Sequence, residues 1–315
     1  MSEGLTRETH FTSFDGTVSL SAPHQRPDRF SHLESPDQTA YRIARGGGYS
    51  YSASSFIENS LVQDMTCFNR FIDFNPETLT LKLEVGVRLI ELMEWALPRQ
   101  LHFPVLPGYH LITVGGCVAA DVHGKNPYKD GTFSDWVKQL TVFHPQKGYQ
   151  TCSAHENPEL FSMTCGGYGL TGIITEVTLQ LAELPSPTIA LSQKQVGSLE
   201  DAERELSACD ADIAYSWHDA TPGASFGRGI VYIGHWSAAE LKPRQTKFHP
   251  MTAKSRARLP ISAWNRVSAK AVNSALLLHS RYKKDVALKS VLGASFPFSS
   301  NVYFHTLFGK PGLRE

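Results

Sequence analysis

Between residues 41 and 181 the sequence alternates short strand-like runs with helical patterns, and glycines stand at the junctions. Strands alternate apolar and polar side chains with period two, whereas helices repeat their apolar side chains every three to four residues. The predicted strands are residues 80–85, 140–144, 149–152 and 173–181, and the predicted helices are residues 88–97 and 159–164. Strands and helices mixed along one stretch predict an α+β fold.

Leu-Pro-Ser-Pro at residues 184–187 interrupts this pattern and predicts a domain boundary. Two domains are therefore expected, residues 1–182 and 183–315, which agrees with the usual domain size for a chain of 315 residues. Residues 1–30 are polar and irregular, and they predict a leading segment rather than a domain of its own. Residues 213–217 and 229–233 are strand-like, so the second domain is also expected to be α+β.

The composition excludes several classes of protein. Apolar residues make up 41% of the chain and charged residues 19%, a balance that a disordered protein does not have. No apolar run approaches the ~18 residues that cross a bilayer, and the N-terminus lacks the apolar stretch of a signal peptide. The five cysteines, with no C-x-x-C pair, argue against a disulfide framework or a metal site. We therefore expect a cytoplasmic protein that binds no metal.

Charge is distributed unevenly along the chain. Residues 1–182 carry thirteen basic and nineteen acidic side chains, whereas residues 183–315 carry seventeen and eleven. Residues 242–289 hold twelve basic side chains and a single acidic one, Asp285. This segment is predicted either to contact an anionic partner, such as a membrane surface or a polyprenyl phosphate, or to form a solvated helical face. No nucleic-acid-binding motif accompanies the segment, so nucleic acid is not an expected partner.

One dinucleotide-like motif is rejected because of its surroundings. Gly167, Gly169 and Gly172 match the spacing G-x-G-x-x-G. That motif holds a pyrophosphate only where a strand precedes it and a helix follows it. Here a predicted helix precedes the glycines and a predicted strand follows them, so we do not expect this motif to bind a dinucleotide.

Two other glycine-rich stretches are expected to bind a cofactor together. Arg-Gly-Gly-Gly-Tyr-Ser-Tyr-Ser at residues 45–52 follows a strand-like run, and its glycines let successive amides point into one concavity. Residues 107–126 contain Pro-Gly, Thr-Val-Gly-Gly and His-Gly-Lys-Asn, with small residues between them. No large side chain there would keep a flat ligand or a phosphate away from the main chain. A tri-glycine turn alone is also typical of a plain loop, so the prediction depends on both stretches.

These two stretches, together with Gly-Leu-Thr-Gly-Ile-Ile at residues 169–174, resemble the flavin oxidoreductases of the vanillyl-alcohol-oxidase type. The resemblance is strong over residues 40–182 and weak over residues 183–315, and it is greatest to members that oxidise the 2-hydroxyl of a lipid-linked ribose. It implies a two-lobed FAD-binding domain of the p-cresol-methylhydroxylase type, followed by an α+β substrate (cap) domain.

The resemblance also implies which residues contact FAD. The loop around the pyrophosphate would comprise Ala44, Arg45, Gly46, Gly47, Gly48, Tyr49, Ser50, Tyr51, Ser52, Ala53 and Ser54. The rest of the cofactor would be lined by Gly108, Thr113, Val114, Gly115, Gly116, Ala120, Asp121, Val122, His123 and Ile174. Members with covalent flavin usually carry a histidine where Tyr49 stands. Non-covalent FAD is therefore implied, unless Cys117 or His110 supplies a link.

The implied reaction is hydride transfer to flavin N5 from a secondary alcohol of a sugar-like substrate, small or carried on a lipid phosphate. The expected catalytic residues are His123 as proton acceptor, Lys125 as the charged partner of a hydroxyl or phosphate, and Tyr51 as a contact to flavin or substrate. Each has an ordinary alternative: His123 as a simple hydrogen-bonding group, Lys125 as a solvated side chain, and Tyr51 as a packing residue.

The C-terminal stretch departs from the family and leaves other functions open. Residues 304–312 lack the usual Trp-Asn-Arg before the glycine, and further active-site groups of the family, including a lysine, lie beyond the stretch that matches residues 297–315. The alternative enzyme is an aldonolactone or alditol oxidase, which Tyr49 in place of histidine disfavours. The alternative outside the enzymes is an incomplete flavin-binding protein without turnover.

Overall fold

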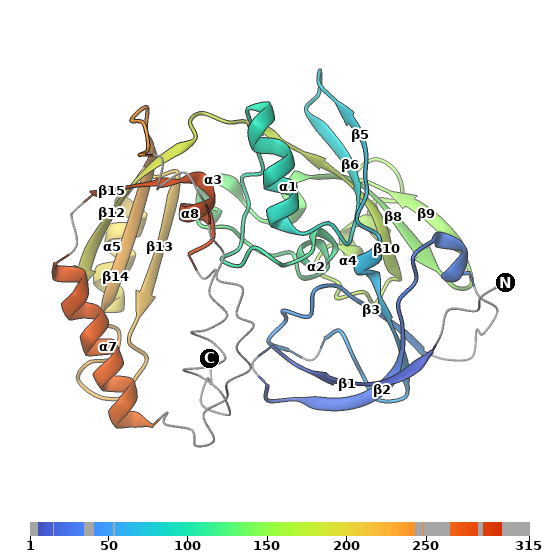
Figure 1. The fold of residues 1–315 in the computed structure, drawn as a ribbon, viewed down its shortest axis with the longest axis horizontal. Coiled ribbons are helices and arrows are strands. Elements are labelled where there is room, and N and C mark those ends of the chain that lie inside the picture. Colours follow the sequence, from blue (N-terminus) through green and yellow to red (C-terminus); the bar gives the residue numbers. More distant parts are fainter. Residues whose placement is uncertain are drawn as a thin grey trace. The chain divides into compact units, whose positions relative to one another are not determined.

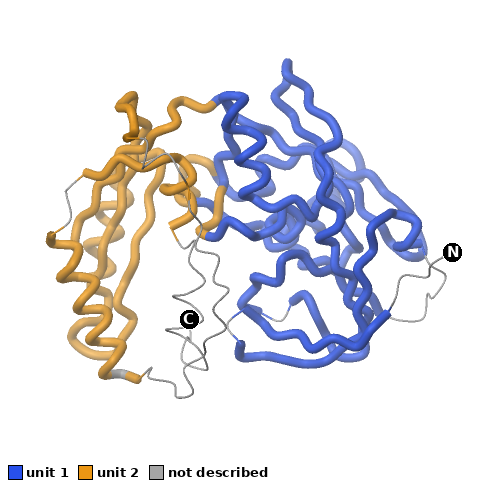
Figure 2. The backbone as a smooth tube through the Cα atoms, in the orientation of Figure 1, with its two compact units in different colours: residues 1–105, 109–124, 131–183 blue, residues 106–108, 125–130, 184–315 orange. Residues whose placement is uncertain are grey.

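The computed structural model describes residues 6–14, 16–34, 41–52, 54–242, 248, 265–282 and 286–297. The chain forms two compact units (Figure 2). The first consists of residues 1–105, 109–124 and 131–183, and the second of residues 106–108, 125–130 and 184–315. The main change of unit falls between Glu183 and Leu184, and two short segments of the N-terminal half belong to the second unit.

The first unit begins with a four-stranded sheet (Figure 1). In spatial order its strands are β1 (Arg7–Thr12), β2 (Ser19–Gln25), β4 (Ser60–Asp64) and β3 (Tyr41–Arg45). β1 and β2 are antiparallel, whereas β4 runs parallel to both β2 and β3. Its apolar core contains Phe11, Ala22, Phe56 and Val62. The prediction of an irregular leading segment was therefore wrong, because β1 buries one side chain and β2 only two, too few to give a clear alternation.

The second sheet of the first unit is antiparallel throughout. In spatial order its strands are β5 (Phe71–Asn75), β6 (Thr80–Glu84), β10 (Ile173–Gln180), β8 (Val137–His144) and β9 (Gly148–Cys152). The central strand β10 buries Ile173, Val177 and Leu179, as its period-two alternation requires. All four strands predicted from the sequence of this unit are confirmed, including the hairpin of β8 and β9.

Helices and short strands complete the first unit. They are η1 (Phe30–His32), η2 (Met65–Cys67), α1 (Leu89–Ala96), η3 (Leu97–Arg99), β7 (Leu101–His102), α2 (Val114–Ala120), η4 (Phe133–Trp136), α4 (Pro158–Thr164) and β11 (Ala182–Glu183). α1 is helical because Leu89, Leu92 and Met93 lie on one buried face. α4 precedes the rejected glycine motif and β10 follows it, so the helix-then-strand order expected there is confirmed. Both predicted helices are present.

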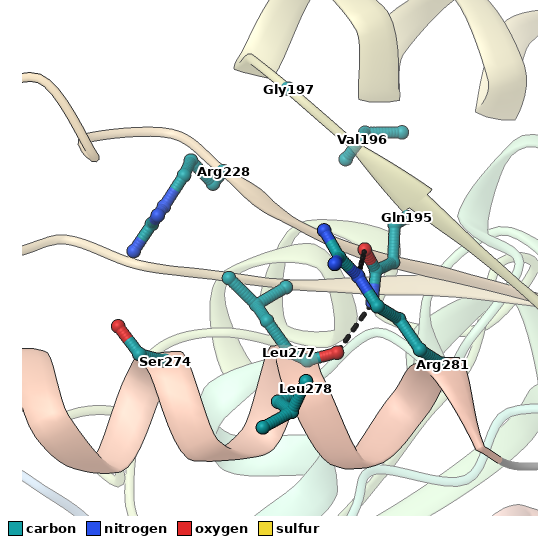
Figure 3. A pocket seen from close by; sticks show the side chains of 8 residues that line it. All are labelled: Gln195, Val196, Gly197, Arg228, Ser274, Leu277, Leu278 and Arg281. Carbon is teal, nitrogen blue, oxygen red and sulfur yellow. Dashed lines mark hydrogen bonds between the residues drawn. The ribbon is translucent and has the colours of Figure 1, made fainter.

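The second unit is a single antiparallel sheet with helices. Its elements are α3 (Pro127–Asp130), β12 (Thr188–Val196), α5 (Leu199–Ala208), β13 (Ile213–His218), β14 (Gly229–Trp236), α7 (Arg266–Arg281), β15 (Val286–Ser290) and α8 (Val291–Ser295). The strand order is β13-β14-β12-β15, and α5 and α7 both contact β12 and β14. A cavity of about 430 Å³ lies beside α7 and the end of β12 (Figure 3).

Both units therefore combine sheets with helices, and the predicted α+β fold is confirmed. Among the described residues, no helix has both the length and the apolar character needed to cross a bilayer.

Candidate functional site

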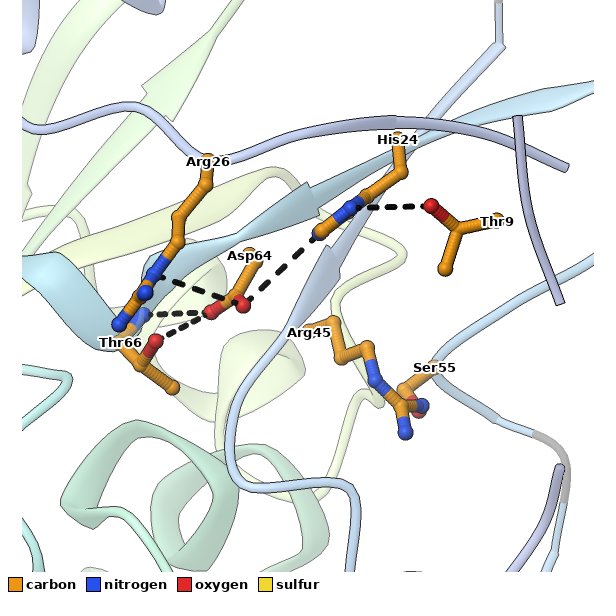
Figure 4. Close-up of polar contacts among 7 residues, drawn as sticks. All are labelled: Thr9, His24, Arg26, Arg45, Ser55, Asp64 and Thr66. Atoms are coloured by element: carbon orange, nitrogen blue, oxygen red, sulfur yellow. Dashed lines mark hydrogen bonds and ion pairs between the residues drawn. The ribbon is translucent and has the colours of Figure 1, made fainter. Parts of the chain in front are cut away.

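The first glycine-rich loop begins where β3 ends, and Arg45 anchors it. The Arg45 Nη1 donates a hydrogen bond of 2.6 Å to Ser55 Oγ, across the loop (Figure 4). Its guanidinium also lies over the rings of Phe11 and Phe56, 5.0 and 5.7 Å from their centroids. Arg45 therefore holds both ends of the loop against the core of the N-terminal sheet.

Asp64 fixes the end of the neighbouring strand, β4. Its Oδ1 accepts hydrogen bonds from the Thr66 amide at 2.9 Å and the Thr66 hydroxyl at 2.6 Å (Figure 4). Its Oδ2 lies 3.8 Å from both His24 Nε2 and Arg26 Nε. Burial is the main cause that lowers the pKa of His24, so this imidazole favours its neutral form. The end of β4, next to the strand that leads into the glycine loop, is thus held by a carboxylate whose two oxygens both have partners within the chain.

The two glycine-rich stretches meet at Gly46. A β-carbon added to Gly46 would collide with Thr113 Oγ1, and one added to Gly47 would lie 3.0 Å from the carbonyl oxygen of Leu111. Thr113 is the N-cap of α2, and its hydroxyl accepts a hydrogen bond from the Gly116 amide at 3.3 Å. Glycine is therefore required at position 46 because the main chain of the loop packs directly on the cap of α2.

The main-chain amides of the two stretches differ in what they can still bind. In α2, the amides of Val114 and Gly115 donate to the carbonyls of Val87 and Val85, both at 2.8 Å. Within the described part of the chain, no hydrogen bond is recorded for the amides of Gly47 or Gly48. Gly48 has φ +75°, a left-handed conformation that glycine adopts without strain. The donors left for an anion are therefore in the first loop, not at the start of α2.

Aromatic side chains flank the first loop. Tyr49 contacts Phe14 and Tyr109 with ring centroids 5.6 and 4.7 Å apart, and Tyr51 contacts Phe14 at 5.4 Å. The Phe14 amide also donates to the Ser50 carbonyl at 3.0 Å. Tyr51 is 38% exposed, so its ring both packs on Phe14 and keeps a face open. Tyr49, the residue from which the sequence resemblance implied non-covalent FAD, forms part of this aromatic contact.

Asp121 shapes the turn that carries His123. It ends α2 in the left-handed region with φ +41°, and its carboxylate accepts hydrogen bonds from the Ser134 amide at 2.9 Å and the Thr132 hydroxyl at 3.1 Å. Thr132 in turn pairs with His123 in an antiparallel bridge. Both carboxylate oxygens of Asp121 are used to brace this turn, and its expected contact with the cofactor stays a prediction.

The hydrogen bond made by His123 defines its neutral tautomer. Its Nδ1 lies 2.9 Å from the Gly124 carbonyl oxygen, which can only accept a hydrogen bond. The proton of the neutral ring therefore sits on Nδ1, and Nε2 carries the free lone pair. The side chain is exposed. His123 thus presents a proton-accepting nitrogen to its surroundings.

Lys125 belongs to the second unit, as does Gly108. The Lys125 Nζ donates a hydrogen bond of 2.9 Å to the Leu106 carbonyl, and its own carbonyl accepts from the Ala214 amide at 2.8 Å. Burial lowers the pKa of the Lys125 ammonium to about 7. The interpretation of Lys125 as a solvated surface side chain does not fit this environment, and near neutral pH both protonation states are accessible.

The other predicted cofactor residues are distributed over the same region of the first unit. Ser50 Oγ lies 3.0 Å from Ser52 Oγ and 3.1 Å from Ser54 Oγ, which makes the loop a compact hydroxyl cluster. Ala44 is the penultimate residue of β3, Ala120 is the last residue of α2, and Val122 follows Asp121. Ile174 is a buried residue of β10. Ala53 lies outside the described residues.

Gln63 is a residue of this region that the sequence interpretation missed. It is fully buried in β4, and neither its Oε1 nor its Nε2 has a hydrogen-bond partner among the residues that the structure describes. Its Cα pairs with that of Ala44 on β3, directly before the glycine loop. An unsatisfied buried amide is costly, by about 1–3 kcal/mol, so such a group needs an explanation. The signal in the sequence was a glutamine within the otherwise apolar Leu-Val-Gln run of this strand.

The thiol and imidazole considered as covalent links to flavin are both buried. Cys117 is fully buried in α2, and burial raises the pKa of its thiol, which makes it a poor nucleophile. His110 is 2% exposed, and burial, assisted by the nearby positive charge of Arg88, lowers the pKa of its imidazole.

Comparison with known proteins identifies the class to which this region belongs. Residues 38–153 match the family of FAD-binding domains. This segment contains the glycine loop, α2 and the Asp121–His123 turn. The chain therefore carries an FAD-binding domain of the p-cresol-methylhydroxylase type, as the motifs predicted, and FAD is its cofactor.

The chain is also similar in sequence to individual oxidoreductases. The chain is 32% identical over 214 residues to decaprenylphosphoryl-beta-D-ribose oxidase of Mycolicibacterium smegmatis, an alignment that covers 66% of this chain and 46% of that protein. It is 30% identical over 140 residues to D-lactate dehydrogenase of Anaerostipes hadrus, covering 43% and 30% of the two chains. It is 26% identical over 193 residues to a putative D-arabinono-1,4-lactone oxidase of Neurospora crassa, covering 60% and 34%. The chain thus spans less than half the length of these relatives.

Proposed function

We propose that this protein is an FAD-dependent oxidoreductase that oxidises a secondary hydroxyl of a sugar-like substrate to a ketone. One arrangement supports the proposal. The amides of Gly47 and Gly48 have no recorded hydrogen bond among the described residues, and the loop that carries them packs on Thr113, the N-cap of α2. α2 in turn leads to the turn at His123, which pairs with Thr132. The relatives support the same class of reaction, since a ribose oxidase and a lactone oxidase are among them.

The first loop fits the diphosphate of FAD. The amides of Gly47 and Gly48 are two consecutive donors, and the hydroxyls of Ser50, Ser52 and Ser54 stand beside them. Neighbouring amides and hydroxyls of this kind form a concavity that binds anions. Arg45 keeps the loop in place from the side of the sheet. We propose that this loop holds the diphosphate, and that α2 contributes a close main-chain approach rather than free amides.

The reaction needs an acceptor for a proton as well as for a hydride. Oxidation of a secondary alcohol breaks the C–H bond with transfer of a hydride and releases the proton of the hydroxyl group. Bound FAD supplies the hydride acceptor. We propose that His123 Nε2 accepts the hydroxyl proton, because its tautomer leaves this nitrogen unprotonated. The pKa of about 7 would let Lys125 hold a substrate oxygen as a cation or share the proton as a neutral amine.

The substrate that we favour is a ribose carried on a polyprenyl phosphate, oxidised at its 2-hydroxyl. The support is the 32% identity to decaprenylphosphoryl-beta-D-ribose oxidase over 66% of this chain. An aldonolactone or alditol is the second candidate, supported by the similarity to a putative D-arabinono-1,4-lactone oxidase. We further propose that FAD is bound non-covalently, because Tyr49 stands in the position of the linking histidine. Acid precipitation tests this point: the flavin should appear in the supernatant, and flavin in the pellet would contradict it.

The proposed function is tested by two successive measurements on the full chain. Titration with FAD should give saturable binding with a shift of the flavin absorption bands. Anaerobic addition of sugar substrates should then bleach the bound flavin, with polyprenyl- or alkyl-phosphoribose compared against aldonolactones and alditols. Binding without bleaching by any of these would leave an FAD-binding protein and contradict the oxidoreductase. No binding at all would contradict the proposed role of the loop.

The role of His123 is tested with a matched histidine variant. His123→Gln should bind FAD as the unchanged protein does and slow bleaching by the substrate at least tenfold, since general base catalysis contributes about 10²–10⁴-fold. His155→Gln, at an exposed position on the loop before α4, is the control and should bleach at the original rate. Equal rates for the two variants would remove His123 from the reaction.

We also propose a cytoplasmic protein whose basic segment, residues 242–289, contacts anionic membrane surfaces. The support is the charge of the sequence alone, because residues 243–247, 249–264 and 283–285 of this segment lie outside the described residues. Co-sedimentation with vesicles containing anionic lipid should be strong at low salt and weak at high salt. Equal recovery with neutral vesicles would contradict the contact.

A further inference from the structure

The cavity beside α7 has no part in the proposed flavin site, and its lining has a definite chemistry. It is formed by the end of β12 at Gln195, Val196 and Gly197, by Arg228 at the start of β14, and by one face of α7 (Figure 3). The residues of α7 are Ser274, Leu277, Leu278 and Arg281. All of these residues belong to the second unit. A volume of about 430 Å³ is within the range of small-molecule sites.

Two guanidinium groups, those of Arg228 and Arg281, are the charged groups of the cavity lining. Arg228 Nη2 pairs with the buried carboxylate of Asp219 at 3.2 Å, and the Arg228 side chain as a whole is 36% exposed. Arg281 forms no ion pair within the described residues; its Nε donates only a long bond of 3.4 Å to Gln195 Oε1. None of the described residues that line the cavity carries a carboxylate. The Arg228 guanidinium, which is shared with Asp219, and the Arg281 guanidinium, which has no ion pair within the described residues, therefore face an anion in the cavity.

Gln195 joins the end of β12 to α7 and offers Arg281 an acceptor. Its Nε2 donates to the Leu277 carbonyl and to Ser280 Oγ near the end of α7, which leaves its Oε1 to face Arg281 (Figure 3). At the other end, Asn273 Nδ2 donates to Asp219 Oδ1 at 2.6 Å and so ties α7 to the carboxylate that holds Arg228. The Arg228 guanidinium is thus held by the Asp219 carboxylate, whereas the exposed Arg281 makes only a long hydrogen bond to Gln195.

The apolar residues that line the cavity favour an aliphatic ligand over a flat aromatic one. Val196, Leu277 and Leu278 form an apolar wall, and Leu278 is 52% exposed although it is a large apolar residue. None of the described residues that line the cavity is aromatic, so a flat nucleobase would find no ring on which to stack. Donors together with an aliphatic wall suit an anion that carries a flexible aliphatic chain.

We propose that this cavity binds an amphiphilic anion, a phosphate or carboxylate head group joined to an alkyl or prenyl chain. The head group would accept hydrogen bonds from the guanidinium groups of Arg228 and Arg281, and the chain would lie along Leu277 and Leu278. This proposal does not depend on the proposed flavin chemistry, because all the groups involved belong to one sheet and one helix of the second unit.

Binding is measured on the full chain with hexyl phosphate, which stays monomeric at millimolar concentration, by calorimetry and by amide NMR shifts of Gly197 and Ser274. Hexyl phosphate should saturate the protein, whereas inorganic phosphate should bind at least tenfold more weakly and hexyl glucoside should not shift these amides. Arg281→Gln should weaken binding at least tenfold, since bonds to charged groups contribute on this scale. Lys270→Gln removes the same charge from α7 outside the cavity, and it should change binding less than twofold.

A second variant tests the cavity itself. Ser274→Phe places a large ring in the cavity from an exposed helix position, so it should abolish binding while the thermal unfolding temperature changes little. Equal loss in Arg281→Gln and Lys270→Gln would indicate diffuse attraction to a basic helix and would overturn the site. Equal affinity for inorganic phosphate would overturn the amphiphile. Binding to anionic vesicles without binding of hexyl phosphate would identify a membrane surface instead.

Discussion

The main chain of Gly46 lies directly against the hydroxyl of Thr113, with no room for a β-carbon between them. The loop after β3 and the cap of α2 are distant in the sequence, yet they form one structural feature. This contact explains why two glycine motifs had to be considered together: one supplies amides, and the other supplies the surface on which the loop rests.

Gly46→Ala should destabilise the first unit by about 1–3 kcal/mol, the usual range for overpacking, and it should weaken FAD binding. Thr113→Ala alone should cost about 1 kcal/mol through loss of the helix cap. Because the alanine at position 46 collides with the Thr113 hydroxyl, the double variant should be more stable than the sum of the single effects. Urea unfolding of the four proteins measures this coupling, and strict additivity would contradict the contact.

Gly115→Ala should destabilise the protein more than Gly116→Ala. A β-carbon on Gly115 would lie 2.7 Å from Val85 Cβ and 3.2 Å from the Val85 carbonyl oxygen, both in the interior, whereas one on Gly116 meets only Thr113 Oγ1 at 3.2 Å and Ile112 Cγ2 at 3.9 Å. The difference in unfolding free energy should be about 1–2 kcal/mol. If Gly115→Ala left stability intact and only weakened FAD binding, Gly115 would face the cofactor rather than Val85.

Asp121→Ala should lower the free energy of unfolding by about 1–3 kcal/mol, since the Ser134 amide and the Thr132 hydroxyl lose their acceptor. Asp121→Asn keeps one oxygen and tolerates the left-handed backbone, so its effect should be smaller. If the turn positions His123, Asp121→Ala should also reduce the bleaching rate of bound flavin more than it weakens FAD binding. The two variants are compared by urea unfolding and by anaerobic bleaching.

Lys125 should make stability depend on pH. Burial lowers the pKa of this group to about 7 in the folded chain, against about 10.4 for an unfolded lysine. Between these values the unfolded chain binds more protons, so stability should rise with pH, with a slope of at most about 1.4 kcal/mol per pH unit. Relative to the unchanged protein, Lys125→Met should therefore gain most stability below pH 7 and progressively less toward pH 10.

The measurement is urea unfolding at pH 6, 8 and 9.5. Lys138→Met, on an exposed position of β8, removes a lysine from the surface and should show no such trend. A difference between Lys125→Met and the unchanged protein that stays constant over this range would mean that the Lys125 ammonium is solvated.

Most of the second sheet could be predicted from the sequence, because β6, β8 and β10 bury one face and their apolar residues alternate accordingly. In the N-terminal sheet, β3 matches the strand-like run before the glycine loop. β1 and β2 could not be predicted, since Phe11 and Ala22 are core residues in strands that are otherwise polar. Assignment of residues 106–108 and 125–130 to the second unit depends on contacts such as that between Lys125 and Ala214, which leave no local pattern.

The sequence predicted those parts of the candidate site in which glycine allows a close approach of the main chain. The glycines at positions 46–48 and 115–116 identify main chain that comes close to something, but they do not say whether that neighbour is a ligand or another part of the chain. In the structure, the neighbour of Gly115 is Val85 and the neighbour of Gly46 is Thr113. The bracing role of Asp121 and the buried amide of Gln63 depend on tertiary contacts, which no spacing in the sequence reveals.

The interleaving of the two units governs how the protein can be dissected. A fragment ending at residue 183 would retain residues 106–108 and 125–130 but lose the sheet to which they belong, while a fragment beginning at residue 184 would leave the Ala214 amide without the Lys125 carbonyl. Neither fragment therefore contains all the residues of one compact unit and no others. A chimaera of two homologues would therefore have to exchange residues 106–108 and 125–130 together with the C-terminal half. During synthesis, these two segments cannot pack in the second unit until the C-terminal half has been translated.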